Sequence, residues 1–112
     1  MLIKLDQCVA EPSRHGNPKY VLARAGILPN VTQVAVAVFP DLVETELHSH
    51  PTMHEVYFVL EGQAVYTIGE DRYEVTPGDF FVVPPGTVHN QKVTVPPHRV
   101  FYWGIAVGDK VL

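Results

Sequence analysis

The stretch HSHPTMHEVYFVLEG, residues 48–62, places three of the chain's six histidines within seven positions. Glu55 directly follows the third histidine, and the apolar run after it ends at Gly62. Side chains of a β-strand alternate between its two faces. If residues 44–50 are extended, His48 and His50 project from one face, and Glu55 on the following strand can join them there. The spacing therefore predicts that these three side chains converge.

Convergence of two imidazoles and a carboxylate is typical of a metal site. These ligands suit iron, manganese, nickel, zinc or copper. A fourth ligand is expected from elsewhere in the chain, and His89, just after Pro84-Pro85-Gly86, is the best candidate. The alternative is that these histidines are hydrogen-bonded core residues. A helical zinc-protease motif, H-E-x-x-H, is excluded because position 58 is Phe within a β-branched and aromatic run.

The sequence around this stretch is typical of an all-β domain. Ten prolines and eight glycines separate short runs rich in Val, Tyr, Phe and Thr. A length of 112 residues suits one domain. No 12-residue window shows convincing helical periodicity. We predict strands at Leu2–Val9, Tyr20–Arg24, Thr32–Phe39, Glu44–His50, His54–Leu60, Gln63–Ile68, Arg72–Val75, Phe80–Val83, Thr87–Val95 and Arg99–Val107.

The connections between these strands have recognisable turn chemistry. Gly69-Glu70-Asp71 predicts a tight hairpin. Thr76-Pro77-Gly78-Asp79 has proline and glycine where a type II turn favours them. Pro96-Pro97 is expected to end one strand before the last begins. Ala10–Lys19, which contains two prolines and Gly16, is expected to be a surface loop.

Several predicted strands are apolar on both faces. In His54–Leu60, Val56 and Phe58 alternate with Tyr57 and Val59. An isolated barrel has one face toward water, so a second sheet or a second subunit is expected to cover the outside. We predict a homodimer, because exposed apolar patches of this kind mark interfaces. The alternative is packing within a sandwich.

Composition excludes some classes of partner. The net charge is −4 and no basic cluster is present, which argues against nucleic acid and anionic membranes as partners. Cys8 is the only cysteine, so no intramolecular disulfide forms, as fits a reducing cytoplasm. Met1–Ala10 lacks a signal-peptide core, and the longest apolar run, Val34–Phe39, is too short to span a membrane. A cytoplasmic location is expected.

At this point the sequence resembles a single-domain cupin, of the conserved-barrel type. The first cupin motif, G-x5-H-x-H-x3–4-E-x6-G, is matched about residues 42–62 by His48, His50, Glu55 and Gly62. The second motif, G-x5-P-x-G-x2-H-x3-N, is matched about residues 78–93 by Gly78, Pro84, Gly86 and His89. Leu42 replaces the first glycine and Val93 the final asparagine; neither position is a metal ligand in the family.

The resemblance implies one cupin domain over residues 1–112, folded as a double-stranded β-helix or jelly-roll barrel. It also implies that one divalent metal ion is held in the barrel by His48, His50, Glu55 and His89. Such a site can leave positions open for water, dioxygen or substrate. The ligand set does not identify the metal among iron, manganese, nickel, zinc and copper.

Strand phase suggests which other side chains face the barrel interior. The candidates for lining a pocket are Tyr57, Gln91, Tyr102 and Gln33. His54 is out of phase with Glu55 and is expected on the opposite face. His15 and His98 lie near prolines, so a solvated surface position is expected for both. Cys8 is expected to be a small buried hydrophobe.

Three functions are compatible with these features. The first is a metal-dependent enzyme on a small molecule, with dioxygenase-, isomerase- (or epimerase-) or lyase-type chemistry. The second is a non-catalytic module that binds or senses a small molecule. The third is a dimer in which the metal has only a structural role. Fold-level analogy does not choose between them.

Overall fold

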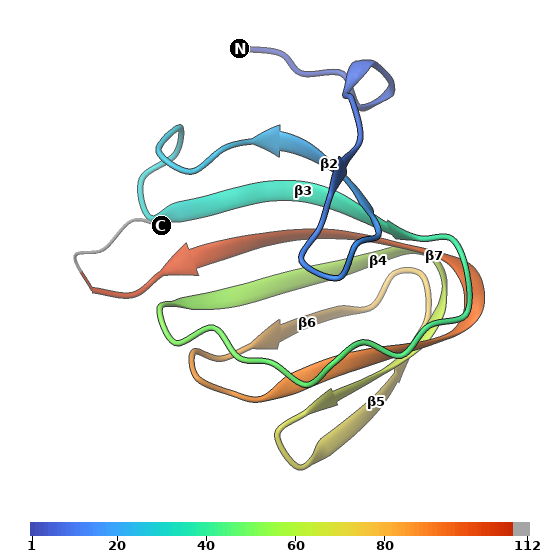
Figure 1. Ribbon diagram of the computed structural model, residues 1–112. Coiled ribbons are helices and arrows are strands. Elements are labelled where there is room, and N and C mark those ends of the chain that lie inside the picture. The colour runs from blue at the N-terminus through green and yellow to red at the C-terminus, as the bar shows by residue number, and fades with distance from the viewer. Residues whose placement is uncertain (109–112) are drawn as a thin grey trace.

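The computed structural model describes residues 1–108, and their regular structure is almost entirely antiparallel β-sheet (Figure 1). This confirms the predicted all-β, jelly-roll fold class. One short 3-10 helix precedes the strands. The elements are η1 (Leu5–Gln7), β1 (Glu11–Pro12), β2 (Pro18–Ala23), β3 (Val31–Phe39), β4 (Met53–Ile68), β5 (Asp71–Val75), β6 (Phe80–Val83) and β7 (His89–Ala106).

Two long strands organise the barrel. The sheet order is β1-β2-β3-β7-β4-β5, and β6 pairs with β4. β4 and β7 pair along their lengths, from Met53 opposite Ala106 to Ile68 opposite His89. Their register shifts between Val59 and Ala64. Both strands curve there, so that each contributes to the upper and the lower part of the fold (Figure 1).

Gly62 lies at this curve and explains why the opening stretch ends on glycine. Its φ is 74°, in the left-handed region that favours glycine. A Cβ at this position would collide with the backbone carbonyl oxygens of Val95 and Pro97 on β7. Glycine therefore allows the two long strands to approach where both of them bend.

Two predicted turns are confirmed. β4 ends at Ile68 and β5 begins at Asp71, which gives the tight hairpin. In the second turn the backbone N–H of Asp79 donates to the carbonyl oxygen of Thr76 at 3.1 Å. Gly78 has a φ of 93° there, as the third position of a type II turn requires.

Two of the predicted strands are wrong. Leu2–Val9 contains η1 and no strand. Glu44–His50 forms only isolated bridges, from Glu44 to Lys92 and from His48 to His89. Apolar or alternating residues in a short segment do not make a strand without a continuous partner. In Figure 1 the segment between β3 and β4 runs beside the first half of β7.

The expectation that Pro96-Pro97 ends a strand is also wrong, because β7 continues through both prolines. Val95 pairs with Gln63 and Arg99 pairs with Glu61, so the prolines lie in the register shift. No ladder hydrogen bond is needed from their nitrogens at that point. The predicted strands 54–60 and 63–68 are likewise one strand, as are the segments from 89 to 95 and from 99 to 106.

The core lies between the curved halves of the sheet. Its buried apolar side chains are Ala37, Phe39, Tyr57, Val59, Ala64, Tyr66, Ile68, Val75, Val83, Val93 and Val100. His98 is 0% exposed and packs with this cluster, so its expected surface position is wrong. The bend of β7 turns residue 98 inward, where its ring contacts those of Phe39 and Tyr66.

Apolar side chains also lie on the outer side of the sheet. Phe58 on β4 is 37% exposed, Ile105 on β7 is 38% and Phe80 on β6 is 62%. Cys8, expected to be buried, is only partly so. In the described part of the chain no helix has the length and apolar character needed to cross a membrane.

Candidate metal centre

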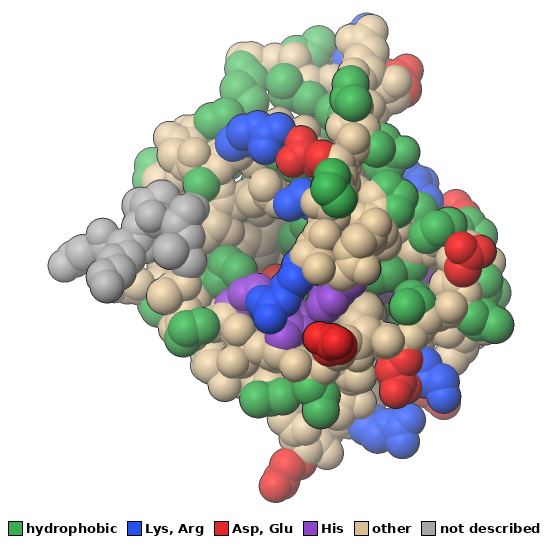
Figure 2. All heavy atoms as spheres, in the orientation of Figure 1, with side chains coloured by type: hydrophobic (Ala, Val, Ile, Leu, Met, Phe, Trp, Pro, Cys, Tyr) green, Lys and Arg blue, Asp and Glu red, His purple; other side chains and the backbone are tan. Residues whose placement is uncertain are grey.

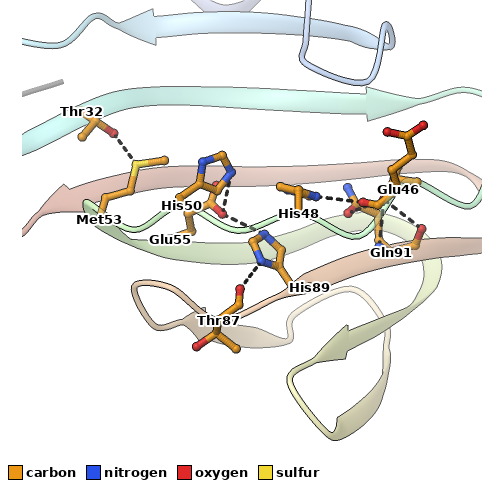
Figure 3. A network of polar contacts seen from close by, with 10 residues as sticks. Thr32, Glu46, His48, His50, Met53, Glu55, Thr87, His89 and Gln91 are labelled. Carbon is orange, nitrogen blue, oxygen red and sulfur yellow. Dashed lines mark hydrogen bonds and ion pairs between the residues drawn. The ribbon is translucent and has the colours of Figure 1, made fainter.

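The predicted ligands come from three separate segments that the fold brings together (Figure 3). His48 and His50 lie in the connection between β3 and β4, Glu55 lies near the start of β4, and His89 begins β7. The backbone N–H of His89 donates to the His48 carbonyl at 2.8 Å, and the His48 N–H donates to the His89 carbonyl at 3.0 Å. This bridge fixes the two residues opposite each other.

The four side chains form a compact cluster. One ligand atom from each of His48, His50, Glu55 and His89 lies within 4.8 Å of the others. Glu55 Oε1 is 3.0 Å from His89 Nε2 and 3.5 Å from His50 Nε2. Glu55 and His89 are buried, while His48 and His50 are half-buried. The cluster therefore has a buried side and a side open to a cavity.

Backbone carbonyls orient two of the imidazoles. His89 Nδ1 donates to the Thr87 carbonyl at 2.9 Å, and His48 Nδ1 donates to the Glu46 carbonyl at 3.0 Å. A carbonyl oxygen can only accept, so the proton of each neutral ring is on Nδ1. The Nε2 atom then has a free lone pair. Histidines that bind metals typically donate their other ring N–H to a carbonyl in this way, which fixes the orientation of the ring.

Two atoms of the cluster are buried without a hydrogen-bond partner in the described residues: Glu55 Oε1 and His89 Nε2. When the His89 proton is on Nδ1, the two atoms present lone pairs to each other across 3.0 Å and form no hydrogen bond. Two unsatisfied buried acceptors cost free energy unless a cation lies between them. This donor set therefore fits a divalent metal ion.

The charge states also suit metal binding. Burial alone would raise the pKa of the Glu55 carboxyl, but His89 and His50, in their protonated forms, outweigh it through a hydrogen bond from His89 and through positive charge, and so lower that pKa. Burial lowers the pKa of His48 and of His50. At neutral pH the carboxylate is thus charged and these two imidazoles are neutral, as ligands must be.

A cavity of about 190 Å³ opens beside the cluster. All four residues suggested by strand phase line it: Gln33, Tyr57, Gln91 and Tyr102. The Gln91 amide oxygen accepts from the Thr45 hydroxyl at 3.1 Å, and the Gln33 amide oxygen accepts from Lys19 Nζ at 2.9 Å. His54, as expected from its phase, is not part of the lining.

Sequence reasoning missed the contribution of the segment 13–19. Ala10–Lys19 was expected to be a surface loop, but Ser13, Arg14, His15, Asn17 and Lys19 line the cavity. His15 is not a solvated surface residue, because its ring lies edge-on to that of His48 at 4.8 Å between centroids. The strand predicted to begin at Tyr20 begins two residues earlier, at Pro18, and therefore includes Lys19. Nothing in the local sequence indicates the position of residues 13–17.

The chain matches a known protein family over more than half of its length. Residues 36–103 match the family model described as Cupin domain. The match includes the four clustered residues, all of β4, β5 and β6, and most of β7.

Curated relatives match over shorter stretches. An uncharacterized protein of Methanocaldococcus jannaschii is 39% identical over 56 residues, which are 50% of this chain and 45% of that protein. A gentisate 1,2-dioxygenase of Haloferax is 38% identical over 47 residues, which are 42% of this chain and 13% of the dioxygenase. The matched regions therefore span less than half of either relative.

Solved structures share the fold over nearly the whole chain. A predicted oxalate decarboxylase of Thermotoga maritima has a TM-score of 0.81 at 16% identity, with coverage of 96% of this chain and 100% of that one. KdgF from Halomonas has a TM-score of 0.78 at 18% identity, with coverage of 93% and 91%. At these identities the likeness concerns the fold alone.

Proposed function

Because this chain belongs to the cupin domain family, we propose that it is a metal-dependent enzyme acting on a small molecule in the barrel cavity. His48, His50, Glu55 and His89 would hold one divalent metal ion. The observation that carries the proposal is the buried, unsatisfied pair of Glu55 Oε1 and His89 Nε2 in a cluster that faces a cavity. A bound metal would supply Lewis-acid or redox chemistry there.

The other polar groups of the lining are suited to hold a substrate. Burial raises the pKa of Tyr102 to about 12 and raises that of Tyr57 well above its usual range. Both phenols therefore keep their protons at neutral pH and act as hydrogen-bond donors rather than bases. Gln91, held by Thr45, offers a positioned amide. These groups would bind and orient a substrate beside the cluster.

The reaction type stays open between dioxygenase-, isomerase- and lyase-type chemistry. The partial match to a gentisate 1,2-dioxygenase supports the dioxygenase branch. The size of the cavity supports a small substrate, since about 190 Å³ lies below the ~300 Å³ at which pockets for drug-sized ligands begin.

The first experiment is elemental analysis of protein purified without chelators and without a metal-affinity tag. About one iron or copper per chain would lead to oxygen-consumption assays with enols, diketones and catechols. About one manganese, nickel or zinc would lead to isomerase and lyase substrates. The Glu55→Gln variant, which keeps the shape but removes the charge, is the matched control for both metal content and turnover.

Two results would contradict the proposal. Absence of metal even after reconstitution with each of these ions would exclude the metal site. A metal-loaded protein that binds a small molecule reversibly and leaves it chemically unchanged would favour the non-catalytic binding function instead.

A further inference from the structure

The cavity beside the metal cluster has an unusual balance of charge for this protein. The chain as a whole is acidic, with 12 Asp and Glu against 8 Lys and Arg. Of the described residues that line the cavity, Glu55 is the one carboxylate, whereas Arg14 and Lys19 are both cationic. Glu55 already faces His50 and His89. The positive charge of the lining is thus not matched by acidic side chains within it.

Neither cation forms an ion pair among residues 1–108. Glu11 lies opposite Lys19 in the pairing of β1 with β2 and interacts with its charge, but the Glu11 carboxylate forms its ion pair with Arg24, at 2.7 Å. Glu46 is exposed and does not line the cavity. Cations without a carboxylate partner beside a cavity are typical of a site that receives its anion from a ligand.

The turn that carries Arg14 is fixed to the barrel, and the Lys19 ammonium is held by a side-chain hydrogen bond. Arg14 lies in a turn where the Ser13 N–H donates to the Asn17 carbonyl at 2.8 Å. The Asn17 side chain donates to the Val38 carbonyl on β3 at 3.0 Å, which ties the turn to the barrel. Lys19 Nζ donates to the Gln33 amide oxygen at 2.9 Å and has two further N–H groups to offer.

The turn also contacts the metal cluster, since His15 lies against His48. In Figure 2 Lys and Arg side chains lie beside the histidines at a hollow of the surface. An anion at this place would meet the cations on one side and the cluster on the other. The cavity of about 190 Å³ is smaller than the ~300 Å³ at which pockets for drug-sized ligands begin, which suits a small organic acid.

We propose that the substrate or ligand of this cavity is a small organic acid whose carboxylate is bound by Arg14 and Lys19. The inference rests on the proposed function of the site and specifies its substrate class. An arginine guanidinium can bind a carboxylate through two parallel N–H donors, and an ammonium adds a point charge. A neutral molecule of the same shape would lack both interactions.

The test is a calorimetric titration with pyruvate, malonate and benzoate, each compared with its neutral methyl ester. The wild-type protein is compared with Arg14→Gln, with Lys19→Gln and with the control Arg72→Gln. Arg72 is an exposed residue of β5 and does not line the cavity. Its replacement by Gln changes the net charge by the same amount as replacement of Arg14 or Lys19. Titrations are run with and without added manganese, and metal content is measured in every sample.

We expect at least one of the acids to bind at least about 10-fold more tightly than its ester. Lys19→Gln should weaken that binding about 10-fold, and the more exposed Arg14→Gln about 3- to 10-fold. Arg72→Gln should leave the affinity within about 2-fold of wild type. Binding should weaken as salt is raised.

Three results would overturn the inference: esters that bind as well as acids, variants of Arg14 and Lys19 that behave like Arg72→Gln, or no acid binding in either metal state. Binding of inorganic phosphate in place of the acids would also overturn it. Failure of the proposed metal site would be a separate result, because it would be seen as absence of metal from the wild-type protein. The acid and ester titrations without manganese still decide the inference in that case.

Discussion

The Tyr66 hydroxyl donates a hydrogen bond to Nε2 of His98 over 2.9 Å in the interior of the barrel. On the other side of the ring, Nδ1 of His98 donates to the Glu61 carbonyl at 3.1 Å. A carbonyl can only accept, so Nδ1 of His98 carries a proton. Burial lowers the pKa of His98, so the ring is neutral at pH 7 and its Nε2 accepts from the Tyr66 hydroxyl. The pair connects the middle of β7 to β4 on both sides of the curve.

This pair predicts that stability decreases in mild acid. Burial lowers the pKa of His98 below 6.5, although the Glu61 carbonyl opposes the shift. The unfolded chain therefore binds a proton at a higher pH than the native protein does. The stability that His98 contributes is complete above about pH 6.5 and is lost as pH falls through the lowered pKa.

The measurement is the free energy of unfolding by denaturant between pH 5 and pH 8, in the presence of a chelator. His98→Gln removes the titrating ring and should cost about 1–3 kcal/mol at pH 8. The free energy of unfolding of this variant should then change less steeply with pH than that of the wild type, by up to about 1.4 kcal/mol per pH unit. Equal slopes for the variant and the wild type would show that His98 does not contribute to the pH dependence.

Gly62 gives a second prediction about the same curve. Gly62→Ala adds a Cβ that collides with the carbonyl oxygens of Val95 and Pro97, at a residue with positive φ. We expect a loss of about 2–6 kcal/mol in the free energy of unfolding. The matched control is Gly26→Ala, where φ is 96° and no atom lies within 4 Å of the added Cβ. That variant should lose about 1–3 kcal/mol.

Denaturant unfolding of the two variants checks this explanation. If Gly62→Ala were no less stable than Gly26→Ala, the close approach of β4 and β7 would not be the reason for glycine at this position.

The fold and the metal cluster could be predicted from the sequence because their signals are local. His48, His50 and Glu55 lie within eight positions, and their spacing matches the first motif even though residues 44–50 form only isolated bridges and no strand. His89 could be added through the spacing of the second motif. The curve of the long strands could not be predicted, because two consecutive prolines usually end a strand. Pro96-Pro97 is tolerated within β7 because it lies at a register shift. The burial of His98 follows from that curve.

The segment around Arg14 shows the other limit of sequence reasoning. Its position over the cavity depends on the bond from Asn17 to Val38, which are 21 residues apart. Such a contact has no signature in composition or alternation. Functional residues that a loop supplies to a rigid barrel are therefore the ones that the sequence alone does not reveal.

The exposed apolar side chains predict self-association. Phe58 and Phe80 pair across β4 and β6 and are 37% and 62% exposed. We expect wild-type protein to sediment as a dimer and the double variant Phe58→Glu/Phe80→Glu to sediment as a folded monomer. Leu28→Glu, at a residue of the β2–β3 connection that is 48% exposed, is the control and should remain dimeric. A monomeric wild type at micromolar concentration would contradict the expected homodimer.

Removal of one candidate ligand should empty the metal site without unfolding the barrel. His50 is half-buried, and it lies in the segment before β4 rather than in the core cluster. His50→Ala should therefore leave the circular dichroism spectrum unchanged. Loss of partners that only orient a ligand reduces metal affinity about 10- to 100-fold, so loss of a ligand itself should reduce it at least about 100-fold.

Elemental analysis of His50→Ala and wild-type protein, prepared in parallel, measures this effect. The control is Leu42→Gly, which restores the first glycine of the motif at a residue that is 69% exposed. Its metal content should equal that of the wild type, because Leu42 does not line the cavity. Full metal content in a folded His50→Ala variant would show that the ion is held elsewhere. The buried pair of Glu55 and His89 would then need another explanation.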